Sequence, residues 1–374
     1  MKQVISLLFF AAIAFASRAQ QPNKVDATEM EKIYQSVKTP YKYGLVLVPS
    51  DTEHKMDCPT IFKKGRKWYM TFLVYGGRGY ETWLAESKDL LNWKQLGRIL
   101  SFSDSTKWDG NQKAGYNALL DTKWGGRYQV NRYQGKYWLS YFGGKEKGYE
   151  PEPLSIGMAY TEKHPATLQE WKRLAQPVLT ANDADVRWWE NRNKLFKSTV
   201  IEDKQHLTGH NFVMYYNAVG DSLANNKKTR WYERIGMAVS NDMEHWQRWG
   251  KDPVVHHPVG ITGDPMIQKM GDTYVMFYFG AFWSDRKGAF NRFAASKDLV
   301  NWTDWTGDNL IESSEAFDEL YAHKSFVMKY KGVVYHFYCA VNKLDQRGIA
   351  VATSADLGKS KLNFVAQGEK HAKN

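Results

Sequence analysis

Residues Gly263–Phe279, GDPMIQKMGDTYVMFYF, form the stretch of this sequence that decides its fold. The stretch begins with an aspartate before a proline, continues as an apolar run, turns at Gly271 and returns as an aromatic run. Two such runs joined by a short turn containing glycine are typical of a β-hairpin. The same layout recurs at Met56–Phe72 and at Lys324–Tyr338, with other polar residues near the start. A repeated hairpin of this kind predicts a ring of similar units, each of which adds one residue to a shared site.

A second motif, Ser-x-Asp followed by an apolar residue and a tryptophan, recurs after these hairpins. It occurs at Ser87–Trp93, Ser240–Trp246 and Ser296–Trp302. Serine and aspartate side chains accept hydrogen bonds from nearby backbone amides in tight turns. The motif therefore predicts a structural turn whose apolar residue and tryptophan pack against neighbouring strands, and we assign it no chemistry.

Aligning the hairpins predicts five units. Their first inner segments are Asp57–Ile61, Gly126–Val130, Phe196–Val200, Gly263–Ile267 and His323–Val327. The spacing of about 60 to 70 residues is enough for four strands and their loops. Five four-stranded units predict an all-β, five-bladed β-propeller over residues 41–366, with Tyr43–Val48 or Lys361–Val365 closing the ring. A β-sandwich, the alternative, accounts for the short strands but not for the fivefold repeat.

Both ends of the sequence are predicted to lie outside the propeller. Met1–Ala19 has the basic start, short apolar core and small final residues of a cleaved signal peptide, so we expect a secreted or periplasmic protein. Residues 20–40 are expected to form a polar extension with a short helix capped by Thr28, and residues 367–374 a polar tail. No apolar run approaches the roughly 20 residues of a membrane span.

Composition narrows the classes of function. The net charge is +11, but lysine and arginine form no block of the kind that binds nucleic acid, so we expect no nucleic-acid partner. The two cysteines, Cys58 and Cys339, are too few for a disulfide framework. Two buried thiols are the favoured state, with a bridge between them as the alternative. The sequence has no glycine-rich phosphate loop, CxxC, HExxH or G-x-S-x-G motif, so neither a metal site nor a cofactor is predicted.

The acid before proline, the aromatic strand and the Ser-x-Asp…Trp turn together resemble the five-bladed propeller glycosidases of glycoside hydrolase families 43 and 32. The resemblance covers about Tyr41–Phe364 and implies a divergent relative of family 43. Those families carry an aspartate at the start of the first inner strand, a second near the third blade and a glutamate at the fourth. Asp57 matches the first position, whereas the third blade offers Lys197 and the fourth Asp264. Such propellers allow a structural calcium ion on the axis.

Two carboxyl groups on opposite sides of the scissile bond are the chemical requirement for glycoside cleavage, one protonated as acid and one ionised as base or nucleophile. In a propeller the first residues of the inner strands converge on a funnel at one end of the axis. We therefore expect Asp57 as the base and Asp264 as the acid or an orienting carboxylate. Glu319 is a second candidate for the acid and Glu190 a third. The resemblance implies inversion of configuration.

Four basic residues stand at or near the starts of the aligned strands: Arg127, Lys197, His323 and Lys324. They are expected to bind a carboxylate or sulfate on the sugar, or inorganic phosphate as in the related family 130 phosphorylases. Trp124 and Trp188 are expected to stack on sugar rings, with core packing as the alternative. The sequence thus predicts a glycoside hydrolase that acts on oligosaccharides derived from polysaccharides. A glycoside phosphorylase and a non-catalytic carbohydrate-binding propeller are the two alternatives.

Overall fold

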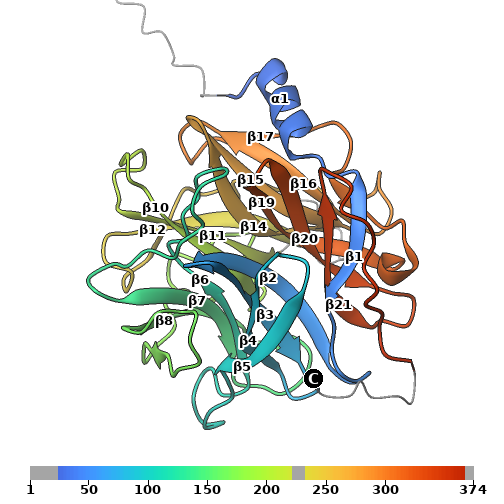
Figure 1. The fold of residues 1–374 in the computed structure, drawn as a ribbon. Coiled ribbons are helices and arrows are strands. Elements are labelled where there is room, and N and C mark those ends of the chain that lie inside the picture. The colour runs from blue at the N-terminus through green and yellow to red at the C-terminus, as the bar shows by residue number, and fades with distance from the viewer. Residues whose placement is uncertain (1–23, 221–231, 367–374) are drawn as a thin grey trace, which may run out of the picture.

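The strands form five blades in residues 24–220 and 232–366, which the computed structural model describes (Figure 1). Pairing is antiparallel within each blade, and one parallel pair, Glu233 with Ile261, joins the third and fourth blades into one sheet. Blade 1 contains β2 (Lys55–Lys64), β3 (Lys67–Tyr75), β4 (Tyr80–Ser87) and β5 (Trp93–Leu100), and blade 2 contains β6 (Gln112–Asn117), β7 (Tyr137–Gly144), β8 (Ser155–Thr161) and β9 (Lys172–Arg173). Blade 3 contains β10 (Leu195–Glu202), β11 (Phe212–Gly220), β12 (Tyr232–Ser240) and β13 (Gln247–Arg248). Blade 4 contains β14 (Ile261–Met270), β15 (Thr273–Ala281), β16 (Ala289–Ser296), β17 (Thr303–Asp304) and β18 (Ile311–Glu312). Blade 5 contains β19 (Tyr321–Tyr330), β20 (Val333–Val341), β21 (Arg347–Thr353) and β1 (Tyr41–Leu47). The predicted signal peptide and polar tail lie outside the described residues.

The first strand closes the ring. Strand β1 pairs antiparallel with β21, with Tyr41 opposite Thr353 and Leu47 opposite Ile349. The earlier of the two predicted closing segments therefore completes the last blade. Pairing the first strand with the last blade leaves no open seam in the ring, because it ties together segments about 300 residues apart. The predicted five-bladed propeller is confirmed.

The repeated turn motif has the predicted structural role. Ser87 Oγ accepts a hydrogen bond from the amide of Leu90 at 3.0 Å, and Asp89 Oδ1 accepts one from the amide of Asn92 at 2.8 Å. Trp93 Nε1 donates to the carbonyl of Leu90 at 2.9 Å, so the tryptophan side chain also stabilises the turn. The equivalent tryptophans of blades 3 and 4 donate in the same way.

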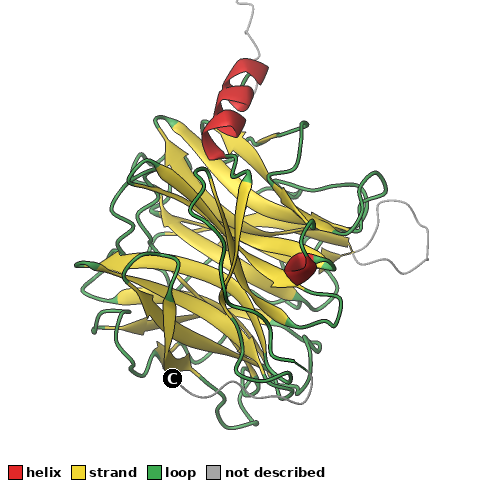
Figure 2. Cartoon of the chain, turned by 45° about the vertical axis from the view of Figure 1, so that its right-hand side comes forward, coloured by secondary structure: helices red, strands yellow, loops and turns green. Residues whose placement is uncertain are grey.

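The N-terminal extension forms helix α1 (Ala27–Val37), which lies outside the body of strands (Figure 2). It packs on blade 4, where Tyr34 stacks on Trp305. Its cap is Asp26, whose Oδ1 accepts from the amide of Glu29 at 2.8 Å, so the prediction of Thr28 was wrong. Both residue types cap helices, but the aspartate stands two residues earlier and its charge suits the positive end of the helix. In the described residues, no helix is long and apolar enough to cross a membrane.

The inner strand of blade 2 is β6, and the prediction that Gly126–Val130 begins this blade was wrong. Strand β6 has neither an acid before proline nor an aromatic run, and it is buried along its whole length. A Cβ at Gly115 would lie 2.6 Å from the side chain of Leu139 and 2.9 Å from that of Thr82. Close packing at this position therefore favours glycine over the larger residues found in the other inner strands. The segment at Gly126 belongs to a long loop before β7.

This loop closes the end of the axis at which the inner strands finish. The amide of Trp124 donates to the carbonyl of Lys269, at the end of β14, at 2.9 Å. The buried Tyr128 donates through its hydroxyl to the carbonyl of Lys329, at the end of β19, at 3.1 Å. The amide of Lys63, near the end of β2, donates to the carbonyl of Tyr128 at 2.8 Å. Any site built from the starts of the inner strands must therefore open at the opposite end.

Candidate active site

A pocket of about 370 Å³ opens at the end of the axis where the inner strands begin. Every blade contributes to its wall. The polar residues that line it are Glu150, Lys194, Lys197, Asn217, Glu233, Asp264, His323, Lys324 and Arg347. The aromatic residues that line it are Tyr80, Tyr116, Phe142, Tyr149, Phe196, Phe279, Phe282 and Tyr321. A polar floor within aromatic walls suits a ligand that carries hydroxyl groups on an apolar ring.

A β-bulge at the start of three inner strands aims side chains into this pocket. The pairing register shifts at the beginning of β2, β14 and β19, and also of β10. At the first three of these shifts a residue other than glycine has a left-handed backbone: Cys58 with φ 49°, Asp264 with φ 57° and Lys324 with φ 61°. Such conformations cost free energy and cluster at functional sites, and bulges redirect side chains. The bulge therefore explains why three residues at equivalent positions of three blades face one cavity.

Four residues expected from the sequence line the pocket. Asp264, Lys197 and His323 are buried with relative exposures of 4%, 3% and 7%, and Lys324 lies beside them. The thiol of Cys58 donates to Asp264 Oδ2 at 3.3 Å, so the starts of blades 1 and 4 do meet at the axis. Both Cys58 and Cys339 are buried free thiols, as the sequence favoured.

Asp57 lies behind the pocket, and its expected position facing the substrate is corrected. It is 1% exposed, and Lys324 Nζ donates to its Oδ2 at 2.7 Å, with Arg347 Nη1 at 3.7 Å from the same oxygen. Burial would raise the pKa of this carboxyl group, but the charges of Lys324 and Arg347 overcome burial and hold the pKa well below its usual range. Asp57 is therefore the counter-ion of the pocket's cations, and its role as base has no support in this geometry.

Glu319, the second candidate for the acid, lies outside the pocket. It is exposed and directly follows the 3-10 turn η1 (Ala316–Asp318). The buried acid of this segment is Asp318, which binds Lys42 and accepts from the hydroxyl of Tyr338 at 2.8 Å. The turn points Glu319 to solvent because Asp318 occupies the inward position.

The expected tryptophans and Arg127 also lie elsewhere. Arg127 and Trp124 belong to the loop at the opposite end of the axis, where Arg127 is exposed. Trp188 Nε1 donates to Asp252 Oδ1 at 3.2 Å, and the Arg234 guanidinium lies 5.1 Å from its ring centroid. Among the described residues, neither tryptophan is one of those that line the pocket.

Glu190, the third candidate, is a structural residue. It is fully buried, accepts from Arg248 Nε at 2.5 Å and accepts from the hydroxyl of Tyr216 at 2.8 Å. Both oxygens are thus engaged in the packing of blade 3.

Replacing Glu190 with glutamine is expected to lower the free energy of unfolding by about 2 kcal/mol, because a buried hydrogen bond to a charged partner is lost. The kcat of the folded protein should not change. Urea unfolding together with activity per folded molecule checks both parts. A loss of activity without a loss of stability would return Glu190 to the catalytic candidates.

Two carboxyl groups that the strand alignment missed complete the pocket: Glu150 and Glu233. Glu150 lies in the loop between β7 and β8, with φ 50°, and Tyr80 Oη donates to its Oε1 at 3.4 Å. Glu233 is the second residue of β12, and Asn217 Nδ2 donates to its Oε2 at 2.9 Å. The acid before proline at Glu150-Pro151 was a usable signal, but it stands outside the repeating hairpin. Glu233 carries no such signal.

The surroundings of these two carboxyl groups differ. Burial raises the pKa of Glu233 to about 8, and the negative charges of Glu150 and Asp264 add to the rise. Burial also raises the pKa of Glu150, but the positive charges of Lys324 and Arg347 oppose the rise. The pKa of both groups is therefore raised, but Glu233 has like charges as its main neighbours, whereas Glu150 has cations that oppose the rise. Two carboxyl groups in different electrostatic surroundings can divide the roles of acid and base between them.

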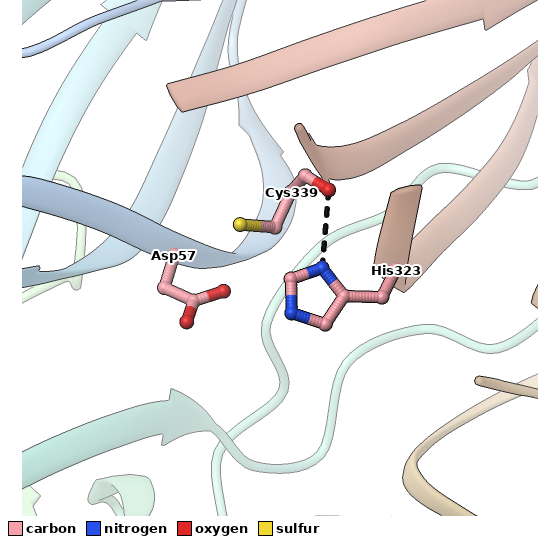
Figure 3. Close-up of side chains that lie close together, drawn as sticks. All are labelled: Asp57, His323 and Cys339. Atoms are coloured by element: carbon pink, nitrogen blue, oxygen red, sulfur yellow. Dashed lines mark hydrogen bonds between the residues drawn. The ribbon is translucent and has the colours of Figure 1, made fainter. Parts of the chain in front are cut away.

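Asp57, His323 and Cys339 each offer a potential metal-binding atom, and these atoms lie within 4.8 Å of one another (Figure 3). His323 Nδ1 donates to the carbonyl of Cys339 at 3.2 Å, which leaves Nε2 as the acceptor. The donor set suits a metal poorly, because the ammonium of Lys324 already occupies Asp57 and burial raises the pKa of the Cys339 thiol. Calcium takes six to eight oxygen ligands, roughly, and this group supplies one carboxylate.

No protein-family model and no curated protein sequence matches this protein. Solved structures do match. One, a BT0996 RGII complex, is 52% identical with a TM-score of 0.88, and the match covers 92% of this protein and 99% of the other. Another, named "Glycoside hydrolase", is 51% identical with a TM-score of 0.87 over the same shares. A thermostable family-43 glycoside hydrolase is similar in fold, with 16% identity and a TM-score of 0.54 over 87% of this protein and 98% of the other.

Proposed function

This protein belongs to the glycoside hydrolases, and we propose that Glu150 and Glu233 together cleave the glycosidic bond of its carbohydrate substrate. It is an enzyme with the propeller fold found in family 43. The observation that carries the proposal is the presence, in one pocket, of two carboxyl groups with different neighbours: carboxylates beside Glu233, and the cations Lys324 and Arg347 beside Glu150. This pair replaces the expected pair of Asp57 and Asp264.

Glu233 is the proposed general acid. Its raised pKa keeps the carboxyl group protonated at neutral pH, so that it can donate a proton to the oxygen of the leaving group. Asn217 holds one carboxyl oxygen of Glu233 and also accepts from the amide of Asp264 at 3.3 Å. Asp264 thereby stays beside the acid, where its charge helps Glu233 to retain the proton.

Glu150 is the proposed base or nucleophile, because Lys324 and Arg347 favour its ionised form. Asp57 fixes these two cations from behind. Inversion, which the resemblance to family 43 implies, needs room for a water molecule and a separation of about 6.5–9.5 Å between the acting carboxyl groups. Proton NMR of the first anomer released tests inversion directly.

The positive charges of the pocket do not require an acidic sugar as their partner, because nearby carboxyl groups offset most of them. At the aligned strand starts of the sequence, two acids, Asp57 and Asp264, stand against four basic residues. In the folded protein, Lys194, Lys197, Lys324 and Arg347 share the site with four carboxyl groups: Asp57, Asp264, Glu150 and Glu233. Because Glu233 is proposed to be protonated, the other three carboxyl groups offset most of the four positive charges, and we propose a neutral sugar at the cleavage position.

Aromatic residues at the mouth of the pocket are proposed to bind the sugar in place of the tryptophans. Phe282 is 51% exposed and Tyr149 is 45% exposed, although both line the pocket. The ring of Phe282 packs edge-on against Tyr321, with 6.1 Å between centroids. Exposed rings beside a polar pocket offer a flat apolar surface to the C–H face of a sugar.

Replacing Phe282 with alanine is expected to raise KM about 5- to 10-fold with little change in kcat, because ring stacking contributes on the order of 1 kcal/mol. Steady-state kinetics on an oligosaccharide checks this. Leu207→Ala is the matched control, since this exposed residue follows β10 at the far end of blade 3. An unchanged KM in Phe282→Ala would remove Phe282 from the binding site.

The proposed substrate is an oligosaccharide from RGII, because RGII is named as part of the complex formed by the 52% identical protein. The test is hydrolysis of RGII oligosaccharides and of a panel of 4-nitrophenyl glycosides in phosphate-free buffer, with mass spectrometry of the products. Release of a free sugar supports the proposal. Cleavage that requires added phosphate and yields a sugar phosphate would indicate a phosphorylase, and binding without cleavage would indicate a non-catalytic propeller. Export of the protein stays a prediction, which N-terminal sequencing of the mature protein tests.

A further inference from the structure

The loop that carries Glu150 reaches out of its own blade. It connects β7 and β8 of blade 2, yet the amide of Gly148 donates to the carbonyl of Arg78 in blade 1 at 2.9 Å. The ring of Tyr149 packs edge-on against Tyr75 of blade 1, with 5.4 Å between centroids. Arg347 Nη1, from the start of β21 in blade 5, donates to the hydroxyl of Tyr149 at 2.9 Å. Three blades therefore meet at the residue that precedes Glu150.

The conformation of the loop at this point is not one that the backbone favours by itself. Glu150 has φ 50°, a left-handed conformation that a residue other than glycine rarely adopts. Such strain persists where surrounding contacts hold it. The described contact of the Glu150 side chain is the 3.4 Å hydrogen bond from Tyr80, which is long. The neighbouring Tyr149 makes the stronger attachment, although nearly half of its surface is exposed.

Two carboxylates fix Arg347 in turn. Its Nη1 lies 3.7 Å from Asp57 Oδ2, and its Nε lies 3.5 Å from Asp345 Oδ1. The Arg347 side chain is 11% exposed, so it is enclosed by these partners. Because Asp57 also binds Lys324, one buried carboxylate anchors both the cation that faces the pocket and the cation that holds the loop.

We propose that Arg347 and Tyr149 are positioning residues, and that the hydrogen bond between them holds the loop of Glu150 across the pocket in its reactive place. The inference rests on the proposed role of Glu150 as base or nucleophile. It adds that this role depends on a contact between blades 2 and 5, through residues that act by placing Glu150 and not by transferring a proton. A misplacement of about 1 Å in a catalytic group lowers the rate by up to 100-fold, roughly, so the contact should be visible in kcat.

Three single variants and one double variant separate the placement of the loop from the charge near Asp57. Tyr149→Phe removes only the hydroxyl, and Arg347→Lys keeps the positive charge but loses the planar donor group. Each is expected to lower kcat about tenfold with KM within about twofold of the original value. Arg347→Met removes charge and contact and should lower kcat about 100-fold. The double variant Tyr149→Phe with Arg347→Met should be no slower than Arg347→Met alone, because both changes break one contact.

Tyr75→Phe is the matched control. The hydroxyl of Tyr75 donates to the carbonyl of Gly77 at 3.2 Å, within its own turn, while the ring that supports Tyr149 is retained. This variant should keep the original kcat. Comparable losses in Tyr75→Phe and Tyr149→Phe would overturn the proposal, since they would point to general loosening of the aromatic cluster.

Hydrogen-exchange mass spectrometry of the whole protein provides a readout that needs no substrate. Peptides covering 145–153 should exchange faster in Tyr149→Phe and Arg347→Met, and those covering the loop at the opposite end of the axis should not change. Kinetics use the substrate hydrolysed best in the panel above. Tyr149→Phe is expected to fold. If it keeps the exchange rates or the kcat of the original protein, the proposal is overturned, even if Arg347→Met is unstable. If Glu150→Gln itself remains active, the proposed function fails; if Glu150→Gln is inactive but Tyr149→Phe is not impaired, only the positioning role fails.

Discussion

Glu233→Gln is expected to lower kcat on an oligosaccharide about 1,000-fold, because glutamine cannot protonate the leaving oxygen. The size of the loss should depend on the leaving group. A 2,4-dinitrophenyl glycoside leaves without a proton, so its hydrolysis by Glu233→Gln should remain close to that by the original protein. Glu202→Gln, an exposed change at the far end of β10, is the matched control and should behave like the original protein on both substrates.

The pH dependence gives Glu233 a second signature. Burial raises the pKa of this group to about 8, and catalysis requires the protonated form. The acid is therefore protonated below about pH 8, and kcat/KM should fall as the pH rises through this value. In Glu233→Gln this alkaline limb should disappear. A limb that persists in the variant would assign the ionisation to another group.

Glu150→Ala is expected to reduce kcat by about 10,000-fold, because the carboxylate that activates water or attacks the sugar is lost. The alanine leaves space beside the sugar, so added sodium azide should restore part of the rate on an activated glycoside and yield a glycosyl azide. Mass spectrometry of the product checks this outcome. Glu152→Ala, an exposed change in the same loop, controls for damage to the loop. A failure of azide to restore any rate, or an original rate in Glu150→Ala, would remove Glu150 from the reaction.

The fold could be predicted because its signals are local. A hairpin and a Ser-x-Asp…Trp turn are each complete within a few tens of residues, and the hydrogen bonds that form them join near neighbours in the sequence, such as Asp89 with Asn92. Repetition of these units at an even spacing then indicates a ring. The prediction failed at blade 2, because β6 lacks both signals. This strand is buried along its whole length, so its place depends on contacts with residues distant in the sequence.

The site could be predicted in part for the same reason. Asp264, Lys197, His323 and Lys324 stand at or near the starts of inner strands, and a propeller brings those starts together. Glu150 and Glu233 were missed because neither stands there. Glu150 reaches the pocket on a loop whose Tyr149 is hydrogen-bonded to Arg347 of blade 5. Glu233 reaches it at the edge of blade 3, where it pairs with Ile261 of blade 4.

The sequence by itself determined the repeat, the number of blades and which ends of the inner strands would form a funnel, because these depend on contacts between residues close in the sequence. Only the tertiary structure decided the chemistry. Asp57 and Lys324, 267 positions apart, form the ion pair that turns the expected base into a counter-ion. The pKa of Glu233 is raised by burial and by the charges of Glu150 and Asp264, which lie on other blades. Charge states follow from solvent exclusion and from distances across the ring, and neither can be read from neighbours along the sequence.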